Sequence, residues 1–383
     1  ARRQRQMCIR DSSTLYEYYQ RCQEYLLEPV VLNMSDTLFR MAGERQDERM
    51  QAVAIATQLD YYYFQGTNED SVIHYTNKVK EFAKATHQPK YYYFAWANRL
   101  ITYYLKTSRT NIALYEVQNM LKEAQEEDDK TGLSRCYNIM SQIYTIKRFD
   151  SMAFEWRLKE IELTEKYKIE NYNISQTYAQ IANYYINQKK QKEALAAVEK
   201  AIATANSSTQ QISAKLEFVN YYSKFGDFQA AEKLLKECQA AFEQDKRLES
   251  IKKRLYNIEC LYYQQTKQYQ KALEAAKMQE KEERRLSESI LSSSHYRTQG
   301  EIYQKMGNMN LAVKYLQMYI NTDDSLKIAN EQVASSEFAT LLNVEKLNAE
   351  KKELMLQAQE KELHNKTTLI ISCLLYTSPS PRD

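Results

Sequence analysis

The stretch Thr177–Ile202, with the sequence TYAQIANYYINQKKQKEALAAVEKAI, decides the fold of this chain. Apolar and small residues recur in it at steps of three and four, which is the spacing of one face of an α-helix. They form two successive stripes: Tyr178, Ile181, Ala182 and Tyr185, then Ala194, Leu195, Val198, Ala201 and Ile202. A short polar segment separates the stripes, so the stretch predicts an antiparallel pair of helices.

The same pattern recurs along most of the chain. In the four clearest copies an aromatic residue precedes the small residue of the second helix by nine positions: Tyr185 and Ala194, Tyr222 and Ala231, Tyr263 and Ala272, Tyr303 and Ala312. Weaker copies place the matching residue at Ala153, Ala113 and Ile73, so the steps are 40, 40, 41, 37, 41 and 40 residues. A regular period of this length indicates a helical repeat array. We expect about seven pairs over residues 47–322, after an incomplete pair over 13–46.

The last copy resembles a known family in detail. Gly300 and Tyr303 in GEIY, Gly307 in the turn MGNMN, and LAVKYL after it fall where tetratricopeptide repeats place a close-packing glycine, a tyrosine, a turn glycine and an alanine. The resemblance covers Gln51–Ile320, although the repeats are longer than that family's and lack its helix-ending proline. It implies a protein- or peptide-binding array whose first helices line a concave groove.

The fold class expected is all-α. The chain contains 6 glycines and 4 prolines, fewer than a sheet-rich protein with many tight turns would use. One helix pair cannot bury its apolar stripe alone, so each pair stacks on the next. The prediction is a right-handed superhelical solenoid of antiparallel, tetratricopeptide-like helix pairs, with a period of about 40 residues, followed by a long single helix.

Both ends of the chain look artificial. Back-translation of residues 2–12 and 373–383 gives the adapter sequences of a tagmented sequencing library, so we expect residues 1–12 and 373–383 to be adapter-derived. Without these ends, the 53 basic and 50 acidic residues of the chain become 48 of each. The apparent basic character then disappears, and with it the compositional argument for binding nucleic acid.

The pattern changes after the array. Residues 323–366 contain no glycine or proline and are rich in charge, which predicts a long helical stalk. Leu342, Ala349, Leu356 and Leu363 form one heptad row, and Leu347 and Leu354 form another, but the two rows do not have the offset of a regular coiled-coil seam. A solvated stalk and a stalk that forms a homodimer both remain open.

Residues 367–372 begin an apolar segment that we interpret as the start of a transmembrane helix, although a complete span needs about twenty such residues. A repeat array, a charged helix and an apolar start together resemble bacterial membrane-anchored tetratricopeptide sensors. That resemblance implies a periplasmic array on an inner-membrane anchor in the bacterial cell envelope, joined to an output domain such as a histidine kinase or a DNA-binding regulator. A cytoplasmic, soluble scaffold that assembles protein partners is the alternative.

The sequence offers little for catalysis, so this fragment is not expected to be an enzyme or to carry a metal or cofactor. The histidines are scattered over different repeats, and no phosphate-binding or nucleophile motif is present: His74, His87, His295 and His364. Cys238 and Cys260 lie where neighbouring pairs pack, which leaves both a disulfide and two unpaired packing residues open.

Asparagines are the best candidates for ligand binding. Five fall at recurring positions of the first helices: Asn98, Asn138, Asn183, Asn220 and Asn257. An asparagine side chain donates to a peptide carbonyl and accepts from a peptide amide at once, which suits recognition of an extended peptide. Asn183 and Asn220 resemble the asparagines of the family's carboxylate-clamp members, but Ala179 and Leu216 stand where those members carry lysine.

Two charged runs, residues 155–170 and 280–285, mix both signs. We interpret them as solvated helix faces with ion pairs between successive turns.

Overall fold

The computed structural model describes residues 14–66, 68–286 and 293–377. Every regular element within those residues is a helix. The predicted adapter residues 1–12 and residues 378–383 lie outside the described part of the chain. The chain divides into two compact units, residues 1–329 and 330–383, which are described separately below.

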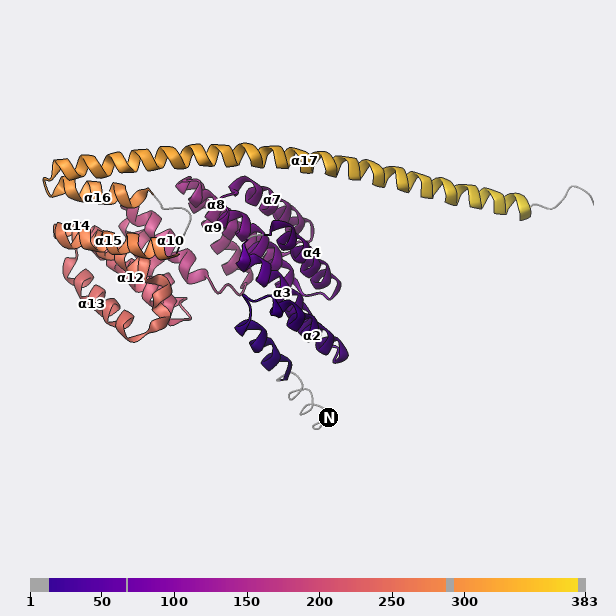
Figure 1. The fold of residues 1–383 in the computed structure, drawn as a ribbon, viewed down its shortest axis with the longest axis horizontal. Helices are drawn as coiled ribbons and strands as arrows, with labels where there is room; N and C mark the ends of the chain where they lie inside the picture. The colour runs from indigo at the N-terminus through magenta and orange to yellow at the C-terminus, as the bar shows by residue number, and fades with distance from the viewer. Residues whose placement is uncertain (1–13, 67, 287–292, 378–383) are drawn as a thin grey trace, which may run out of the picture. The chain divides into compact units, whose positions relative to one another are not determined.

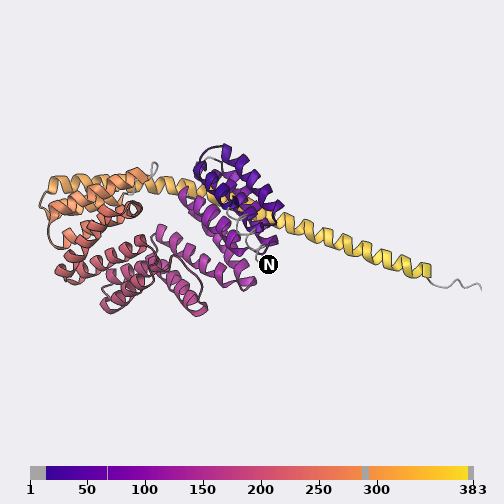
Figure 2. The same ribbon diagram turned by 90° about the horizontal axis from the view of Figure 1, so that it is seen from below.

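The first unit is an array of helix pairs. A helix over residues 14–24 and α2 (Val30–Glu44) precede the array. In the described part of the chain seven pairs follow. The first three are α3 (Glu48–Gln65) with α4 (Glu69–Ala85); α5 (Pro89–Tyr93), the π-helical η1 (Phe94–Ile101) and α6 (Thr102–Lys106) with α7 (Thr110–Glu126); and α8 (Lys130–Ile146) with α9 (Asp150–Tyr167). The last four are α10 (Ile174–Asn187) with α11 (Gln191–Ala203); α12 (Ser208–Phe225) with α13 (Phe228–Gln244); η2 (Lys246–Ile251) and α14 (Lys252–Gln265) with α15 (Tyr269–Leu286); and α16 (Ser294–Lys305) with the start of α17 (Met309–Thr377). Consecutive pairs lie side by side (Figures 1 and 2).

The turn inside each pair contains a residue with a left-handed backbone conformation. In the described pairs one residue at this turn has a positive φ, between 58° and 92°: Gly66, Ser108, Arg148, Lys189, Gly226, Lys267 and Gly307. Three of the seven are glycines, for which this left-handed conformation is free of steric cost, whereas the other four carry a side chain. The shared geometry explains why the repeat length is kept in pairs whose sequence resemblance to the other copies is weak.

Neighbouring pairs share one apolar core. One cluster joins residues of α9, α10, α11 and α12, and the next joins α12, α13 and α14. The small residues that defined the repeat lie in this core with at most 2 % of their surface exposed: Ala113, Ala153, Ala194, Ala231, Ala272 and Ala312. Gly300 allows α16 to approach α17, since a Cβ atom there would lie 2.9 Å from Leu316 Cγ. The expected all-α repeat array is therefore confirmed.

The described cysteines are free and buried: Cys22, Cys136, Cys238 and Cys260. The disulfide considered between Cys238 and Cys260 is not formed. Burial raises the pKa of the Cys238 thiol to about 12, so this side chain is a neutral packing group at ordinary pH.

The array and the stalk are not separated by a turn. The second helix of the last pair continues through residues 322 and 323, where the sequence analysis divides array from stalk, and runs unbroken to Thr377. In the second unit Leu354 and Leu356 are 65 % and 52 % exposed. The predicted start of a membrane span lies within this helix, but the side chains of 368–372 are outside the described residues. Among the helices described, none combines the length and the apolar character that crossing a bilayer requires.

Candidate binding groove

A polar hollow of the array lies along the first helices of the third to sixth pairs. It has a volume of about 490 Å³, and we call it the central cavity. Its walls come from α8, α9, α10, α12 and α14: Thr145, Asp150, Arg157, Ala179, Gln180, Asn183, Tyr184, Asn187, Gln188, Glu217, Arg254, Asn257 and Ile258. Amide and charged side chains dominate this set, so the cavity offers hydrogen bonds rather than an apolar pocket.

A buried carboxylate organises one wall of the central cavity. Glu217 is 1 % exposed, and its Oε1 accepts hydrogen bonds from Nδ2 of Asn220 at 2.8 Å and of Asn183 at 3.2 Å. Its Oε2 accepts one from Nη2 of Arg254 at 2.7 Å. Asn187 in turn donates to Asn183 Oδ1 at 3.0 Å. This network fixes side chains from three first helices, because a buried carboxylate must be paired and hydrogen-bonded.

A second buried charge also lines the central cavity. Arg157 of α9 is 7 % exposed. Its Nε donates to Gln180 Oε1 at 2.8 Å, and its Nη2 donates to Thr145 Oγ1 at 2.6 Å. Burial lowers the pKa of Arg157, although Glu160 and Asp150 favour its charged form at longer range. An arginine stays protonated in proteins under these conditions, so a positive charge faces this cavity.

The structure places the five predicted asparagines in different settings. Asn183 and Asn257 line the central cavity, whereas Asn220 lies behind it in the Glu217 network. Asn257 is exposed, and its side chain forms no hydrogen bond with any described residue. Asn138 lies elsewhere, beside Glu160, and Asn98 is exposed on η1 outside this cavity. Two of the five residues, Asn183 and Asn257, therefore lie on one surface, although they belong to two different registers of the first helix, one turn apart.

Asn138 serves a second buried carboxylate. Glu160 is 1 % exposed and accepts from Asn138 Nδ2 at 3.1 Å and from Asn171 Nδ2 at 2.8 Å. Burial raises the pKa of Glu160, and the hydrogen bonds from these two asparagines and from Thr177 act in the opposite direction. The amide of Asn138 therefore holds a structural carboxylate and does not project into the central cavity.

Sequence reasoning missed Arg157, Glu160 and Glu217. The interpretation of residues 155–170 as a solvated face was wrong at two positions, because Arg157 and Glu160 are buried. The signal was available: both lie on the stripe that starts at Ala153, at steps of four and seven residues along a helix. A search for apolar periodicity passes over charged residues on a buried stripe.

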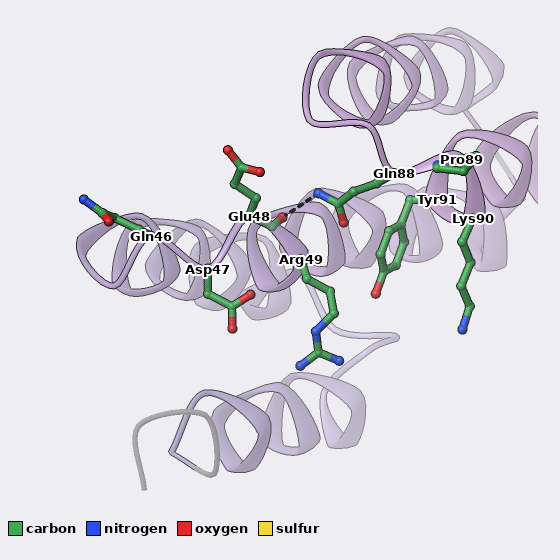
Figure 3. Close-up of a pocket in the computed structure, with 8 residues that line it drawn as sticks. All are labelled: Gln46, Asp47, Glu48, Arg49, Gln88, Pro89, Lys90 and Tyr91. Carbon is green, nitrogen blue, oxygen red and sulfur yellow. Dashed lines mark hydrogen bonds between the residues drawn. The ribbon is translucent and has the colours of Figure 1, made fainter. Parts of the chain in front are cut away.

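A second hollow lies at the turns that lead into α3 and α5. It has a volume of about 620 Å³, and Figure 3 shows its eight lining residues: Gln46, Asp47, Glu48, Arg49, Gln88, Pro89, Lys90 and Tyr91. Arg49, Lys90 and Tyr91 point to the same side, and Gln88 Nε2 donates to the Glu48 carbonyl oxygen at 3.2 Å. Arg49 and Lys90 are exposed, so water already solvates their charges. This hollow is the weaker candidate.

Metal binding finds no support within the described residues. No group of three or more histidine, cysteine, aspartate or glutamate side chains there is arranged to hold an ion. His295 is 4 % exposed, and its Nε2 lies 3.6 Å from Glu280 Oε1. It is a core residue of α16, in keeping with a structural role.

Comparison with known proteins supports the fold. No protein-family model and no curated protein matches the chain. Among solved structures, the apo form of the quorum sensor NprR from B. thuringiensis matches with a TM-score of 0.50 and 13% identity, over 81% of this chain and 99% of that one. A tetratricopeptide repeat protein from Parabacteroides merdae matches with a TM-score of 0.43 and 12% identity, over 84% and 99% of the two chains.

The chain has a tetratricopeptide-repeat fold. A Rap protein complexed with competence and sporulation factor also matches, with a TM-score of 0.49 and 14% identity over 83% of this chain and 99% of the other. At identities this low the likeness concerns the fold alone. The ligand of the tetratricopeptide-repeat array must therefore be argued from its own side chains.

Proposed function

We propose that this array binds a protein segment or peptide in the central cavity. The observation that carries the proposal is the unused hydrogen-bonding capacity of that surface. Asn257 has no side-chain partner among the described residues, and Gln188 is exposed beside it. Amides that both donate and accept match the alternating carbonyl and N–H groups of an extended backbone.

The remaining walls support selective binding rather than loose contact. The Glu217 network and the bonds of Arg157 to Thr145 and Gln180 hold charged side chains in fixed positions before a ligand arrives. Preorganised groups lower the entropy lost on association. NprR, whose apo form shares the fold, has also been solved with its cognate peptide NprX.

We further propose that the array is the sensory region of a membrane-anchored signalling protein of the bacterial cell envelope. The support is α17, which joins the last repeat to the stalk without a turn. A ligand that changes the packing between pairs would displace this helix, since stacked repeats contact only their neighbours. Pairing of two stalks through exposed residues such as Leu354 and Leu356 would make the signal a change within a homodimer.

Peptide selection tests the binding role. The full chain is immobilised, and a random peptide library is selected against it. Peptides that bind through the central cavity should lose affinity for Asn257→Ala. Asn119→Ala is the matched control, because Asn119 is an exposed asparagine on α7, a second helix. Equal affinity for both variants and for the unchanged chain would remove the central cavity as the binding site.

Genomic sequence tests the anchoring role. Reading the natural gene past the codon for Ser372 should show an apolar segment of about twenty residues followed by an output domain. A polar continuation and a stop codon would instead favour the soluble scaffold that assembles protein partners.

A further inference from the structure

We infer that the central cavity contains a carboxylate-binding subsite at Arg157, so that the ligand is an acidic peptide. This inference rests on the proposed function and specifies the ligand chemistry that the function leaves open. It concerns a carboxylate from either of two sources, an aspartate or glutamate side chain or the C-terminus of the peptide.

The first argument is the incomplete pairing of the guanidinium group. Arg157 is 7 % exposed, yet its two hydrogen bonds go to a neutral amide and a neutral hydroxyl. No carboxylate of the described residues forms an ion pair with it, and its Nη1 forms no hydrogen bond there. A buried charge is costly unless it is paired, so a carboxylate from a ligand would supply the partner that the chain does not.

The second argument is that no acidic group around Arg157 forms an ion pair with it within the described residues. Glu160 lies on the same helix, but its oxygens accept from Asn138, Asn171 and Thr177. Glu217 belongs to the network with Arg254. Asp150, at the start of α9, lines the same cavity and acts on Arg157 only at longer range, because it is exposed and makes no ion pair with Arg157 within the described residues. None of these carboxylates therefore occupies the position that a ligand would take.

The third argument is geometry. Gln180 and Thr145 hold the guanidinium plane through Nε and Nη2, so its direction is set before a ligand binds. A planar guanidinium with free N–H groups matches the two oxygens of a carboxylate better than an ammonium group does. The nearby amides of Asn183 and Asn257 would contact the peptide backbone on either side of that carboxylate.

The test is a double-mutant cycle with peptides selected on the full chain. Each selected peptide is made in three forms: unchanged, with its acidic residue replaced by the matching amide, and with its C-terminus amidated. Removing the critical carboxylate should weaken binding to the unchanged protein about tenfold. The same removal should change binding to Arg157→Gln by less than about twofold. The form that loses affinity identifies the source of the carboxylate.

Two further variants provide controls for this test. Arg157→Lys keeps the charge but loses the planar fork, so its affinity should fall between those of the unchanged protein and Arg157→Gln. Arg157→Lys also replaces Arg157→Gln in the cycle if Arg157→Gln loses the helical circular dichroism spectrum of the unchanged protein. Arg247→Gln is the control, since the Arg247 side chain is 78% exposed and paired with Asp245 outside the central cavity.

The outcomes separate the inference from the proposed function. Peptides that depend on Asn257 but show no coupling to Arg157, or that bind equally well without any carboxylate, overturn the inference and leave the function intact. Peptides whose affinity depends on neither Asn257 nor Arg157 overturn both the inference and the proposed function. A selection that yields no binding peptide also contradicts both.

Discussion

Two arginines of the array show how differently one residue type is used in neighbouring regions. Arg99, on η1 of the second pair, forms an ion pair with Asp60 of α3, and the two side chains are 17% and 14% exposed. Its guanidinium carbon also lies 4.3 Å from the centre of the Phe94 ring and 4.8 Å from that of Tyr63. Arg157, on α9 of the third pair, donates instead to the neutral side chains of Gln180 and Thr145, and within the described residues neither a carboxylate nor a ring pairs with it.

The comparison distinguishes two kinds of charged site. In the first, which we call the closed site, the counter-charge comes from the chain itself; in the second, the charge faces the central cavity. The charge of Arg99 is neutralised by Asp60 and covered by aromatic rings, so nothing remains for a ligand to satisfy. The charge of Arg157 is positioned by neutral groups and faces the central cavity. We therefore treat a buried charged residue as a functional candidate only when no group of opposite charge in its own chain forms a direct ion pair with it.

Removing the Glu217 carboxylate should cause the largest loss of stability in the central region of the array. Glu217→Leu leaves Arg254 without its partner and leaves Asn183 and Asn220 without their acceptor. We expect a loss of about 3 kcal/mol in the free energy of unfolding, measured by urea denaturation. Glu217→Gln, which keeps one acceptor oxygen, should lose clearly less. No loss of stability in either variant would contradict the role given to the network.

Breaking the ion pair of Arg99 and Asp60 should lower the free energy of unfolding by a smaller amount and should not affect ligand binding. Asp60→Asn removes the counter-charge of Arg99, and we expect a loss of about 2 kcal/mol in the free energy of unfolding, because the pair is partly exposed. Peptides selected on the unchanged chain should bind this variant with the same affinity. A loss of affinity as large as that of Arg157→Gln would contradict the distinction between the two arginines.

The pH dependence of stability should distinguish a buried carboxylate from an exposed one. Burial raises the pKa of Glu160, so the folded chain holds this proton more tightly than the unfolded chain does. The stability from this group is therefore present below the ordinary glutamate pKa of about 4.3 and is lost as the pH rises. Glu160→Gln lacks that loss, so its stability relative to the unchanged protein should increase as the pH rises towards neutrality.

Glu165 on the same helix provides the matched control. Hydrogen bonds from Lys200 and Tyr178 lower the pKa of Glu165, so its contribution to stability is present above the ordinary glutamate pKa and is lost as the pH falls. Relative to the unchanged protein, Glu165→Gln should become less stable as the pH rises. Urea denaturation of both variants over this pH range measures the two slopes. Slopes of the same sign would contradict the roles given to these carboxylates.

The smallest effect concerns the turns. Lys189 has a φ of 58° in the fourth pair, whereas Gly226 occupies the same turn of the fifth pair with a φ of 92°. Lys189→Gly removes the steric cost of the left-handed conformation, partly offset by greater freedom of the unfolded chain, so we expect a gain of about 0.5 kcal/mol. Gly226→Ala should lose about 1 kcal/mol. Thermal denaturation checks both signs, and a destabilised Lys189→Gly would contradict the argument.

The repeat and its core could be predicted from the sequence because they depend on apolar periodicity. Ala194, Ala231 and Ala272 were placed in the core from their spacing alone, and they are buried. The turn glycine expected at Gly307 has the left-handed conformation. Apolar spacing is sufficient here since every pair must bury its stripe against the next.

The candidate site was less predictable because its main residues are polar residues on buried stripes. Glu217 and Glu160 occupy core-facing positions, and their burial depends on partners 34 and 22 residues away in the chain, Asn183 and Asn138. Such partners become visible only when the two helices of a pair, or the helices of neighbouring pairs, are packed together. The unbroken α17 is not predictable for a different reason: the composition changes near residue 323, which predicts a boundary, but no turn residue lies there.

The most direct test of the account is a crystal structure of the full chain with a selected acidic peptide. We predict that the peptide lies in the central cavity and that one of its carboxylate oxygens is about 2.7–2.9 Å from a guanidinium nitrogen of Arg157. The pair of Arg99 and Asp60 should be unchanged in that complex. A peptide bound away from Arg157, or one bound in the central cavity with no carboxylate near this side chain, would contradict the account.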